Sequence, residues 1–213
     1  MINVTYKHHV GDDLDTVNAA RVSFDKEAHE LDSKDERLIN YLGEHNHISP
    51  FGHSFIRFKV DAPVFVARQL VKHEYLRFNE VSRRYVDYEP DTYSPDFWRS
   101  RPQNKKQGSG PAFGDTGQQL LQRDYADMMS MVTKMYERFI ELGVAPEQAR
   151  MMLPQSMMTS WWWSGSLDAF AKMCRLRLGP DAQAETREVA IQVAEIVEPL
   201  FPVSWKALMK VKD

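Results

Sequence analysis

Cysteine is nearly absent from the sequence, with Cys174 the single residue of this type among 213. One cysteine excludes an intrachain disulfide and any zinc site built from several cysteines. Cys174 lies in the helical pattern DAFAKMCRLRL and shares an apolar face with Phe170, which favours a buried core thiol over a nucleophile. We therefore expect no covalent chemistry at this side chain.

Long apolar runs and a dominant charge are also absent. No stretch approaches the roughly 20 apolar residues that a membrane span needs, and the N-terminal MINVTYKHHVGDD lacks the layout of a signal peptide. A formal net charge of −3 creates no overall field that attracts nucleic acid or an anionic membrane. We expect a cytoplasmic protein that binds neither nucleic acid nor membrane, so any anion site must be local.

Common cofactor and metal signatures are missing as well. The sequence contains neither GxGxxG nor a P-loop, so it indicates no Rossmann dinucleotide site and no nucleoside triphosphate cradle. His45, His47 and His53 are close in sequence, but they lack the helical i, i+4 spacing and the acidic partners of a metal site. We predict that the protein holds no metal.

The length and composition fit one domain. A chain of 213 residues with 43% hydrophobic and 27% charged residues is typical of a globular domain with a buried core. Residues 89–114 are rich in Pro, Gly, Asn, Gln and charge, and we interpret them as an exposed excursion rather than an interdomain linker. We expect a single domain over residues 1–213.

Periodicity predicts a mixture of strands and helices. Alternation of apolar and polar residues predicts strands at residues 2–6, 54–60 and 84–87 and in QSMMTSWWWSGS. Helical spacing predicts helices at residues 12–20, 64–76, 116–142, 167–178 and 182–197, a short helix in APEQARMMLP and a terminal turn after Pro202. Ser33 and Glu36 form a capping box for a further helix that ends near His45. Asp61 and Pro63 are expected to begin the helix at 64–76, and Ser166 is expected to cap the helix at 167–178.

Two apolar features leave alternatives open. Side chains alternate in a strand, so the three consecutive Trp at residues 161–163 cannot face one side, and the odd ring belongs to a sheet face or a subunit contact. In the long helix at 116–142, Met128, Met131 and Met135 form a stripe that belongs to the core or to a subunit interface.

Polar side chains crowd the stretch VARQLVKHEYLRFNEVSRRYVDY, residues 66–88. A helix that leads into a loop can gather side chains around a ligand, and the Ser82 hydroxyl beside the Arg84 guanidinium suits a phosphate. Arg150, Arg177 and Arg187 also stand beside small polar groups, although each taken singly fits a surface or ion-pair role. The sequence therefore predicts an anion site near Ser82.

Seven stretches together resemble the flavin-dependent thymidylate synthases. The hallmark of that family is R-H-R, followed by seven residues and S. Here seven residues separate Lys72-His73-Glu74 from Ser82. The other stretches follow in the family's order at compatible spacings: AARVSF, HNHISPFGH, APVFVARQ, ARMMLP, WSGSL and RLRLGPDAQAETR. The resemblance covers nearly the whole chain.

The resemblance implies a fold and a reaction. The fold is α/β (α+β), with a central, mostly antiparallel sheet flanked by helices, which is the thymidylate synthase-complementing protein fold. The reaction converts dUMP to dTMP with methylenetetrahydrofolate as carbon donor and FAD, reduced by NADPH, as hydride source. A homotetramer with sites between subunits is also implied, as is a host-cell cytoplasm if this member is viral.

The resemblance also implies site residues by position. The candidate dUMP contacts are Gln69, Lys72, Glu80, Ser82, Arg83 through its backbone, Arg84, Arg150 and Arg177. The candidate FAD or folate contacts are His47, Ser49, Lys72, His73, Glu74, Asn79, Glu80, Ser166, Asp168 and Lys172. Arg177 matches the arginine at the pyrimidine edge and is the catalytic candidate, because a nearby cation stabilises a developing anion at N3.

Several positions depart from the family pattern, and all of them fall in the flavin half. Lys72 and Glu74 replace arginines, Asp168 and Lys172 replace Arg and Asn, and Gly52 replaces a common Glu. Two additional carboxylates near a pyrophosphate are unfavourable, so Arg68, Arg77 or Arg83 are candidates to bind the phosphates instead. The alternatives are a related one-carbon transfer, such as hydroxymethylation or a cytosine substrate, and a non-catalytic nucleotide-binding homologue.

Overall fold

The computed structural model describes residues 1–103 and 107–211. Residues 104–106, which belong to the excursion expected at 89–114, and residues 212–213 lie outside the described part. No helix within the described ranges is long and apolar enough to cross a membrane.

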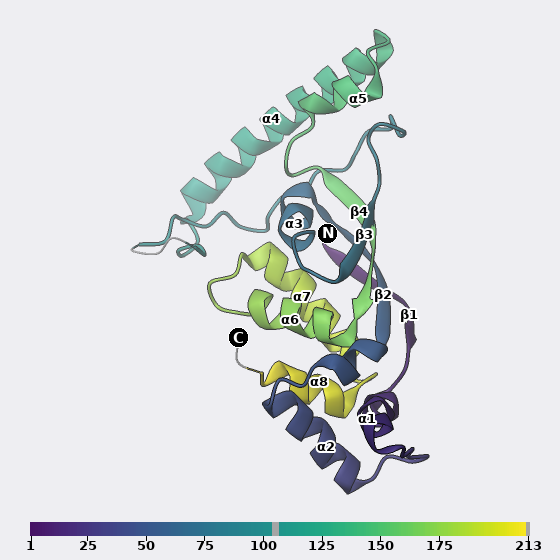
Figure 1. Cartoon of the computed structure of the whole chain (residues 1–213). Coiled ribbons are helices and arrows are strands. Elements are labelled where there is room, and N and C mark those ends of the chain that lie inside the picture. The colour runs from purple at the N-terminus through teal and green to yellow at the C-terminus, as the bar shows by residue number, and fades with distance from the viewer. Residues whose placement is uncertain (104–106, 212–213) are drawn as a thin grey trace.

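The centre of the fold is a four-stranded antiparallel sheet in the order β1-β2-β4-β3 (Figure 1). Its strands are β1 (Asn3–Val10), β2 (Phe55–Pro63), β4 (Met158–Ser166) and β3 (Leu76–Glu80). The expected central antiparallel sheet is confirmed. The strand predicted at 84–87 is wrong, because the Tyr85 N–H donates to the Ser82 carbonyl at 2.9 Å and makes a turn there. The edge strand lies earlier, where Phe78 stacks on Trp161 with ring centroids 5.0 Å apart.

Helices cover one face of the sheet and one of its ends (Figure 1). α3 (Val64–Leu70), α6 (Leu167–Arg177) and α7 (Ala184–Val197) lie along the face, and α1 (Asp13–Arg21), α2 (Ser33–Glu44) and α8 (Pro202–Met209) gather at the end. Short 3₁₀ segments occur at η1 (Val22–Phe24), η2 (Ser49–His53) and η3 (Arg150–Met152). The terminal turn expected after Pro202 is in fact the helix α8, whose first position suits proline because its missing N–H would have no intrahelical partner.

Aromatic packing joins the sheet to α6. Phe170 meets Phe58 and Trp163 edge to face, with ring centroids 5.1 and 5.2 Å apart, a favourable geometry for aromatic pairs. Cys174 is fully buried beside them, and burial raises the pKa of its thiol. The prediction of a core cysteine is therefore confirmed.

The three consecutive tryptophans alternate across β4. Trp161 and Trp163 are buried, whereas Trp162 is 49% exposed on the face of the sheet without helices. The cationic ends of Lys7 and Arg57 lie 6.0 and 5.9 Å from the centre of its ring. The prediction that the odd ring faces away from the core is confirmed.

Two predicted helix boundaries are wrong. The capping box of α2 consists of Asp32 and Asp35 rather than Ser33 and Glu36. The Asp32 side chain accepts from the Asp35 N–H at 2.9 Å, and the Asp35 side chain accepts from the Asp32 N–H. The helix predicted at 64–76 ends at Leu70. Its predicted start at residue 64 is confirmed, with Pro63 as N-cap, whereas Asp61 lies within β2 and does not cap it. Tyr75 has a positive φ of 62°, and the chain turns before β3.

The excursion leads into α4 (Asp115–Glu141), which extends away from the sheet and is followed by α5 (Pro146–Ala149) (Figure 1). Met128, Met131 and Met135 are 58, 68 and 42% exposed, whereas Met129 and Tyr136 of the same helix are buried. The core alternative for the methionine stripe is therefore wrong within one chain, and the subunit-interface alternative stands as a prediction.

The close approach of β3 to β4 at Gly165 makes a testable prediction. A Cβ added at Gly165 would meet the Tyr75 carbonyl oxygen at 2.9 Å and would also contact Leu76. Gly165→Ala should lower the free energy of unfolding, measured in urea, by about 1–3 kcal/mol, the usual cost of overpacking. Gly179→Ala is the matched control, because its added Cβ would make only an ordinary contact, 3.5 Å from the Leu176 carbonyl oxygen. Equal stability of the two variants would contradict the packing of β3 on β4.

Candidate functional site

The end of β3 and the turn after it form one wall of a cleft of about 840 Å³. Glu80 ends β3, and its carboxylate accepts from the Thr159 hydroxyl of β4 at 2.7 Å. Ser82 and Arg84 follow in the turn, and Arg150 of η3 lines the same cleft. Arg84 and Arg150 are exposed, so their guanidinium groups can reach a ligand. Arg68 of α3, a candidate for the FAD phosphates, is exposed and lines the cleft as well. Three exposed cations and a hydroxyl in one cleft suit a phosphate group.

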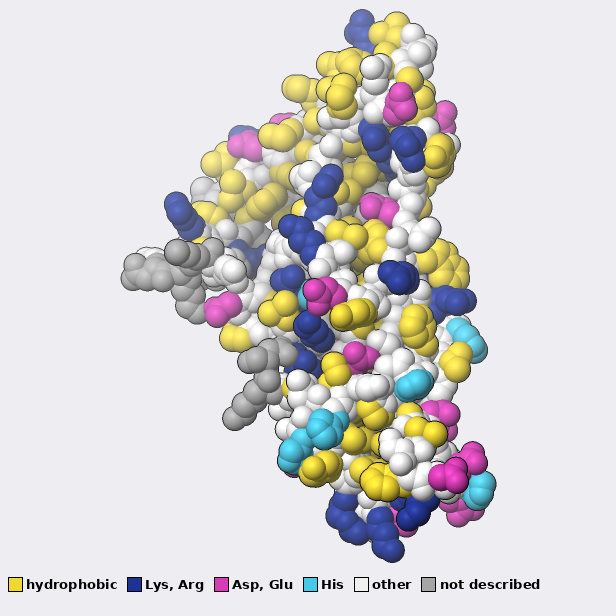
Figure 2. All heavy atoms as spheres, viewed as in Figure 1, with side chains coloured by type: hydrophobic (Ala, Val, Ile, Leu, Met, Phe, Trp, Pro, Cys, Tyr) yellow, Lys and Arg dark blue, Asp and Glu magenta, His cyan; other side chains and the backbone are white. Residues whose placement is uncertain are grey.

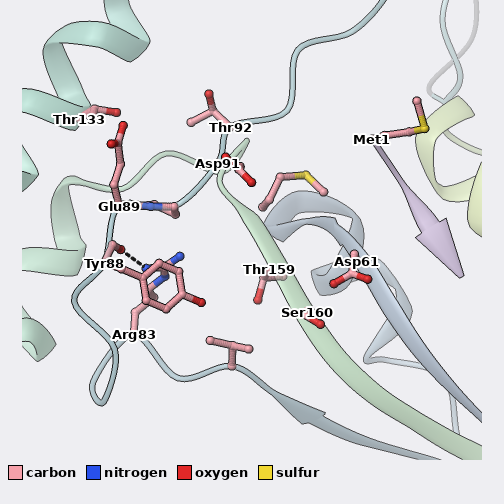
Figure 3. A pocket seen from close by; sticks show the side chains of 13 residues that line it. Met1, Asp61, Arg83, Tyr88, Glu89, Asp91, Thr92, Thr133, Thr159 and Ser160 are labelled. Atoms are coloured by element: carbon pink, nitrogen blue, oxygen red, sulfur yellow. Dashed lines mark hydrogen bonds between the residues drawn. The ribbon is translucent and has the colours of Figure 1, made fainter. Parts of the chain in front are cut away.

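Arg83 differs from its neighbours because its side chain is buried. Its Nη1 donates to the Tyr88 carbonyl at 2.6 Å, and its guanidinium lies 4.6 Å from the centre of the Tyr88 ring (Figure 3). The side chain thus holds the segment after Ser82 in place. The dUMP contact through the Arg83 backbone stays a prediction, whereas its buried guanidinium is engaged by Tyr88 and does not point to the FAD phosphates from here.

Gln69 and Arg177 line a second cavity, of about 460 Å³, together with Arg99 and Gln183. Gln69 stands next to the last residue of α3, and Arg177 ends α6. The 840 Å³ cleft and the 460 Å³ cavity have no lining residue in common. All the candidate dUMP residues except Lys72 therefore line one or the other of two different hollows of a single chain.

His73 and Arg177 contact each other directly. The Arg177 Nε donates to the His73 Nε2 at 3.0 Å, which places the imidazole proton on Nδ1. Burial, followed by the positive charges of Arg177 and Lys172, lowers the pKa of His73 to about 4. His73 is therefore neutral at pH 7 and acts as an acceptor that orients Arg177. Burial also lowers the pKa of Arg177.

Four of the five departures from the family pattern, all except Lys72, occur as neighbouring pairs. The Lys172 Nζ lies 3.2 Å from the Glu74 carboxylate, and both side chains are more than half exposed. Gly52 lies beside Asp168, because a Cβ added at Gly52 would stand 3.7 Å from the Asp168 Oδ1. The prediction that Glu74 is unfavourable beside a pyrophosphate stays a prediction, and the Lys172 ammonium offsets part of its charge.

Asp168 lies in the first turn of α6, and its Oδ1 is buried without a hydrogen-bond partner in the described structure. A buried carboxylate oxygen of this kind requires a donor. Hydroxyl and amino groups are donors, whereas a phosphate is not. Asp168 can therefore belong to a cofactor site if it meets a hydroxyl or an amine.

The remaining candidate residues lie around these groups. Lys72 is exposed in the turn after α3, and Asn79 is exposed on β3. His47 is exposed between α2 and η2, and Ser49 is exposed as the first residue of η2. Ser166 is half-buried at the end of β4, and it precedes α6 without the predicted side-chain capping bond. Lys and Arg side chains gather over α3 and α6 in the middle of the visible face (Figure 2). Among the described residues, no three His, Cys, Asp or Glu side chains stand close enough to hold a metal.

Three residues that the sequence analysis did not select either line the cavity of Arg177 or contact residues that line it. Arg99 and Gln183 line the cavity, and Glu185 contacts both of them. Gln183 and Glu185 belong to the stretch RLRLGPDAQAETR, which could have identified them. Arg99 lies in the excursion and carries no comparable signal.

Comparisons with known proteins agree over nearly the full length. The family described as "Thymidylate synthase complementing protein" matches residues 6–203. A flavin-dependent thymidylate synthase of Thermus thermophilus is 38% identical over 198 residues, which are 93% of this chain and 72% of that protein. The enzyme of the same name from Kosmotoga olearia is 36% identical over 200 residues, or 94% of this chain and 86% of that protein.

Solved structures are similar as well. The UMP/dUMP methylase PolB from Streptomyces cacaoi bound with 5-Br dUMP has a TM-score of 0.87 at 29% identity and covers 97% of this chain and 94% of its own. The same methylase bound with 5-Br UMP has a TM-score of 0.87 at 28% identity, with coverage of 98% and 94%.

The contact between His73 and Arg177 predicts an unusual titration. The His73 imidazole, followed by NMR, should protonate near pH 4, and Arg177→Met should move this midpoint upward because a positive neighbour is removed. Lys172→Met should move it less, and Arg37→Met, on the exposed side of α2, should leave it unchanged.

The same pKa of His73 determines whether the stability of the fold rises or falls with pH. Because the folded pKa of His73 lies below its ordinary value of 6.5, its neutral form stabilises the fold above pH 6.5, and this contribution is lost as pH falls toward 4. A wild-type midpoint near 6.5, or one that Arg177→Met does not move, would contradict the contact.

Proposed function

This chain belongs to the thymidylate synthase complementing protein family, and we propose that it is a flavin-dependent thymidylate synthase whose dUMP site forms between two copies of the chain. The enzyme methylates dUMP, with FAD as its flavin and with NADPH and methylenetetrahydrofolate as the other partners that this family uses. When bound, FAD supplies the hydride for the reduction. The buried Cys174 takes no part, which agrees with a reaction that needs no cysteine nucleophile.

The observation that carries the site proposal is the separation of the nucleotide residues into two groups. The cleft of Ser82, Arg84 and Arg150 supplies phosphate donors but contains no group at the pyrimidine edge. The cavity of Gln69 and Arg177 supplies that edge but contains neither Ser82 nor Arg84. A second copy that brings its cleft against this cavity completes the site, as symmetric assemblies commonly do.

Arg177 is proposed to stabilise negative charge on the pyrimidine. Its Nε is held by His73 at 3.0 Å, so its remaining N–H groups are oriented before the nucleotide arrives. A guanidinium fixed in this way stabilises charge as it develops, and it does not have to reorganise during the reaction. Ser82 binds the nucleotide and is not a nucleophile in this proposal.

The residues near the start of α6 fit FAD. The unpartnered Oδ1 of Asp168 can accept a hydrogen bond from a hydroxyl or amino group of the cofactor. Lys172, one turn later, can approach a phosphate as a point charge. His47, Ser49, Lys72, Asn79, Glu80 and Ser166 stay candidates for the FAD and folate contacts.

The assembly and the location are also proposals. A homotetramer agrees with the incomplete sites of one chain and with the exposed methionines of α4. A cytoplasmic location rests on the composition, with its single cysteine.

A second candidate reaction is methylation of UMP. It is favoured by the similarity of this chain to a methylase that was solved with both 5-Br dUMP and 5-Br UMP. Mass analysis of the products formed from dUMP and from UMP, each with FAD, NADPH and methylenetetrahydrofolate, distinguishes the two reactions. It would also detect hydroxymethylation.

The proposal predicts that the two groups are equally essential. Arg84→Ala and Arg177→Ala should each reduce dTMP formation by about 100-fold or more, the usual effect of removing a group that stabilises transition-state charge or positions the substrate. Both variants should keep the flavin absorbance of the wild type, and Arg37→Ala is the matched surface control. Unchanged turnover in Arg177→Ala would contradict its role.

A mixing experiment tests whether the site is shared. When Arg84→Ala and Arg177→Ala chains are expressed together, hybrid pairs contain one site with both native arginines, so about a quarter of the wild-type activity should return. If both arginines of each site came from one chain, every site would carry one defect. The mixture would then stay as inactive as its components.

The pairing of Glu74 with Lys172 makes a prediction about the cofactor. Glu74→Gln removes the carboxylate that competes for the Lys172 ammonium and should tighten FAD binding up to about fivefold, because an exposed pair contributes at most about 1 kcal/mol. The affinity is measured by quenching of flavin fluorescence. The double variant Glu74→Gln, Lys172→Gln should not show this tighter FAD binding. An unchanged FAD affinity in Glu74→Gln would argue against a cofactor at this end of the turn.

A further inference from the structure

We propose that Arg99, Glu185 and Gln183 are positioning residues that fix the direction of the Gln69 amide, so that Gln69 discriminates uracil from cytosine nucleotides. This inference rests on the proposed function, since Gln69 is taken there as a pyrimidine contact. It adds Arg99 of the excursion and Gln183 and Glu185 at the start of α7 to the residues that determine substrate specificity.

A continuous chain of polar contacts connects the excursion to Gln69. The Arg99 Nη2 lies 2.5 Å from the Glu185 Oε1. The other oxygen of this carboxylate, Oε2, accepts from the Gln183 Nε2 at 3.0 Å. Gln183 in turn accepts a hydrogen bond from the Gln69 Nε2. The four residues come from the excursion, the start of α7 and the end of α3.

Glu185 determines the direction of the whole chain of contacts. It is 5% exposed, and Arg99 pairs with it as a counterion. An ionised carboxylate only accepts hydrogen bonds. Gln183 must therefore turn its NH₂ group toward Glu185, and its carbonyl oxygen faces the opposite way.

The same reasoning fixes Gln69. The Gln183 carbonyl oxygen can only accept, so Gln69 must turn its NH₂ group toward it. The two ends of an amide have nearly the same shape and differ in hydrogen bonding. A glutamine without such a neighbour could turn over at little cost, whereas Gln69 has one defined direction beside Arg177.

A glutamine of fixed direction can distinguish the two pyrimidines. Uracil carries a carbonyl acceptor at ring position 4 where cytosine carries an amino donor, and their N3 atoms also differ in hydrogen bonding. Since the Gln69 NH₂ group faces Gln183, its carbonyl oxygen is left for the base, where it accepts from the N3–H of uracil but meets an acceptor at N3 of cytosine, which is unfavourable in a partly buried cavity. An amide that turns freely matches both.

Two substitutions interrupt the chain of contacts at different points. Glu185→Gln replaces the obligatory acceptor by an amide whose oxygen faces Arg99, since Arg99 can only donate, so its NH₂ group faces Gln183 and the Gln183 amide turns over. Gln183→Met removes the connection and leaves the ion pair of Arg99 and Glu185 in place, so it tests the inference even if Glu185→Gln does not fold. Arg99→Lys keeps a cation beside Glu185 and should behave as the wild type. Glu195→Gln, on the exposed side of the same helix, is the matched control.

The measurement is the ratio of dCMP to dUMP dissociation constants, obtained by calorimetry on the FAD-loaded protein. We expect this ratio to fall about tenfold in Glu185→Gln and in Gln183→Met, the effect of one buried hydrogen bond, and to stay unchanged in Arg99→Lys and Glu195→Gln. A general loss of packing would weaken both nucleotides alike and would not change the ratio.

The outcomes separate this inference from the proposed function. If the wild type prefers dUMP and both substitutions keep its ratio, the positioning role is overturned while the proposed function stands. If the wild type binds neither nucleotide, the dUMP site itself is wrong, and this inference falls with it.

Discussion

The five-residue turn between α3 and β3 determines where most groups of the site lie. α3 packs on the covered face of the sheet, and β3 forms the edge, so the chain has residues 71–75 in which to change direction. Tyr75 adopts a left-handed conformation, and Gly165 on β4 has no Cβ that would block the backbone of the turn. This path brings His73 to Arg177 and Glu74 to Lys172. It also points the end of β3, with Glu80 and Ser82, toward η3.

The structure changes the interpretation of the unusual charges near the flavin half. Considered singly along the sequence, Glu74 and Asp168 are carboxylates that repel a pyrophosphate. In space, Glu74 forms a neutral pair with Lys172, and Asp168 faces the space that Gly52 leaves open. A carboxylate in a neutral pair adds little repulsion, and a buried acceptor selects donors. These departures from the family pattern therefore compensate each other as neighbouring pairs, and they are compatible with a bound flavin.

Sequence patterns predicted the elements that local residues determine. The alternation of β2 and β4, the long α4 and the burial of Cys174 follow from periodicity within each segment. The edge strand was placed wrongly because its stability comes from the contact of Phe78 with Trp161, which lies far away in the sequence. The capping box was displaced by one residue because Asp32 with Asp35 and Ser33 with Glu36 satisfy the same spacing.

The candidate site was predictable as a set of residues but not as an arrangement. The family resemblance selected His73 and Arg177, but their hydrogen bond joins residues 104 positions apart. Arg99 could not be selected, since its importance comes from a buried carboxylate of α7 that no local pattern connects to the excursion.

Both groups of candidate dUMP residues carry positive charge, which explains why they are kept apart in one chain. Arg84 and Arg150 line one cleft with Glu80 as a nearby acid, and the Glu80 carboxylate already accepts from Thr159. Arg177 lies in the other cavity against a neutral His73, which gives it orientation without cancelling its charge. A nucleotide monophosphate provides the missing negative charge at both places, on its phosphate and on its reacting ring. In the proposed shared site, binding of the substrate stabilises the contact between subunits that completes it.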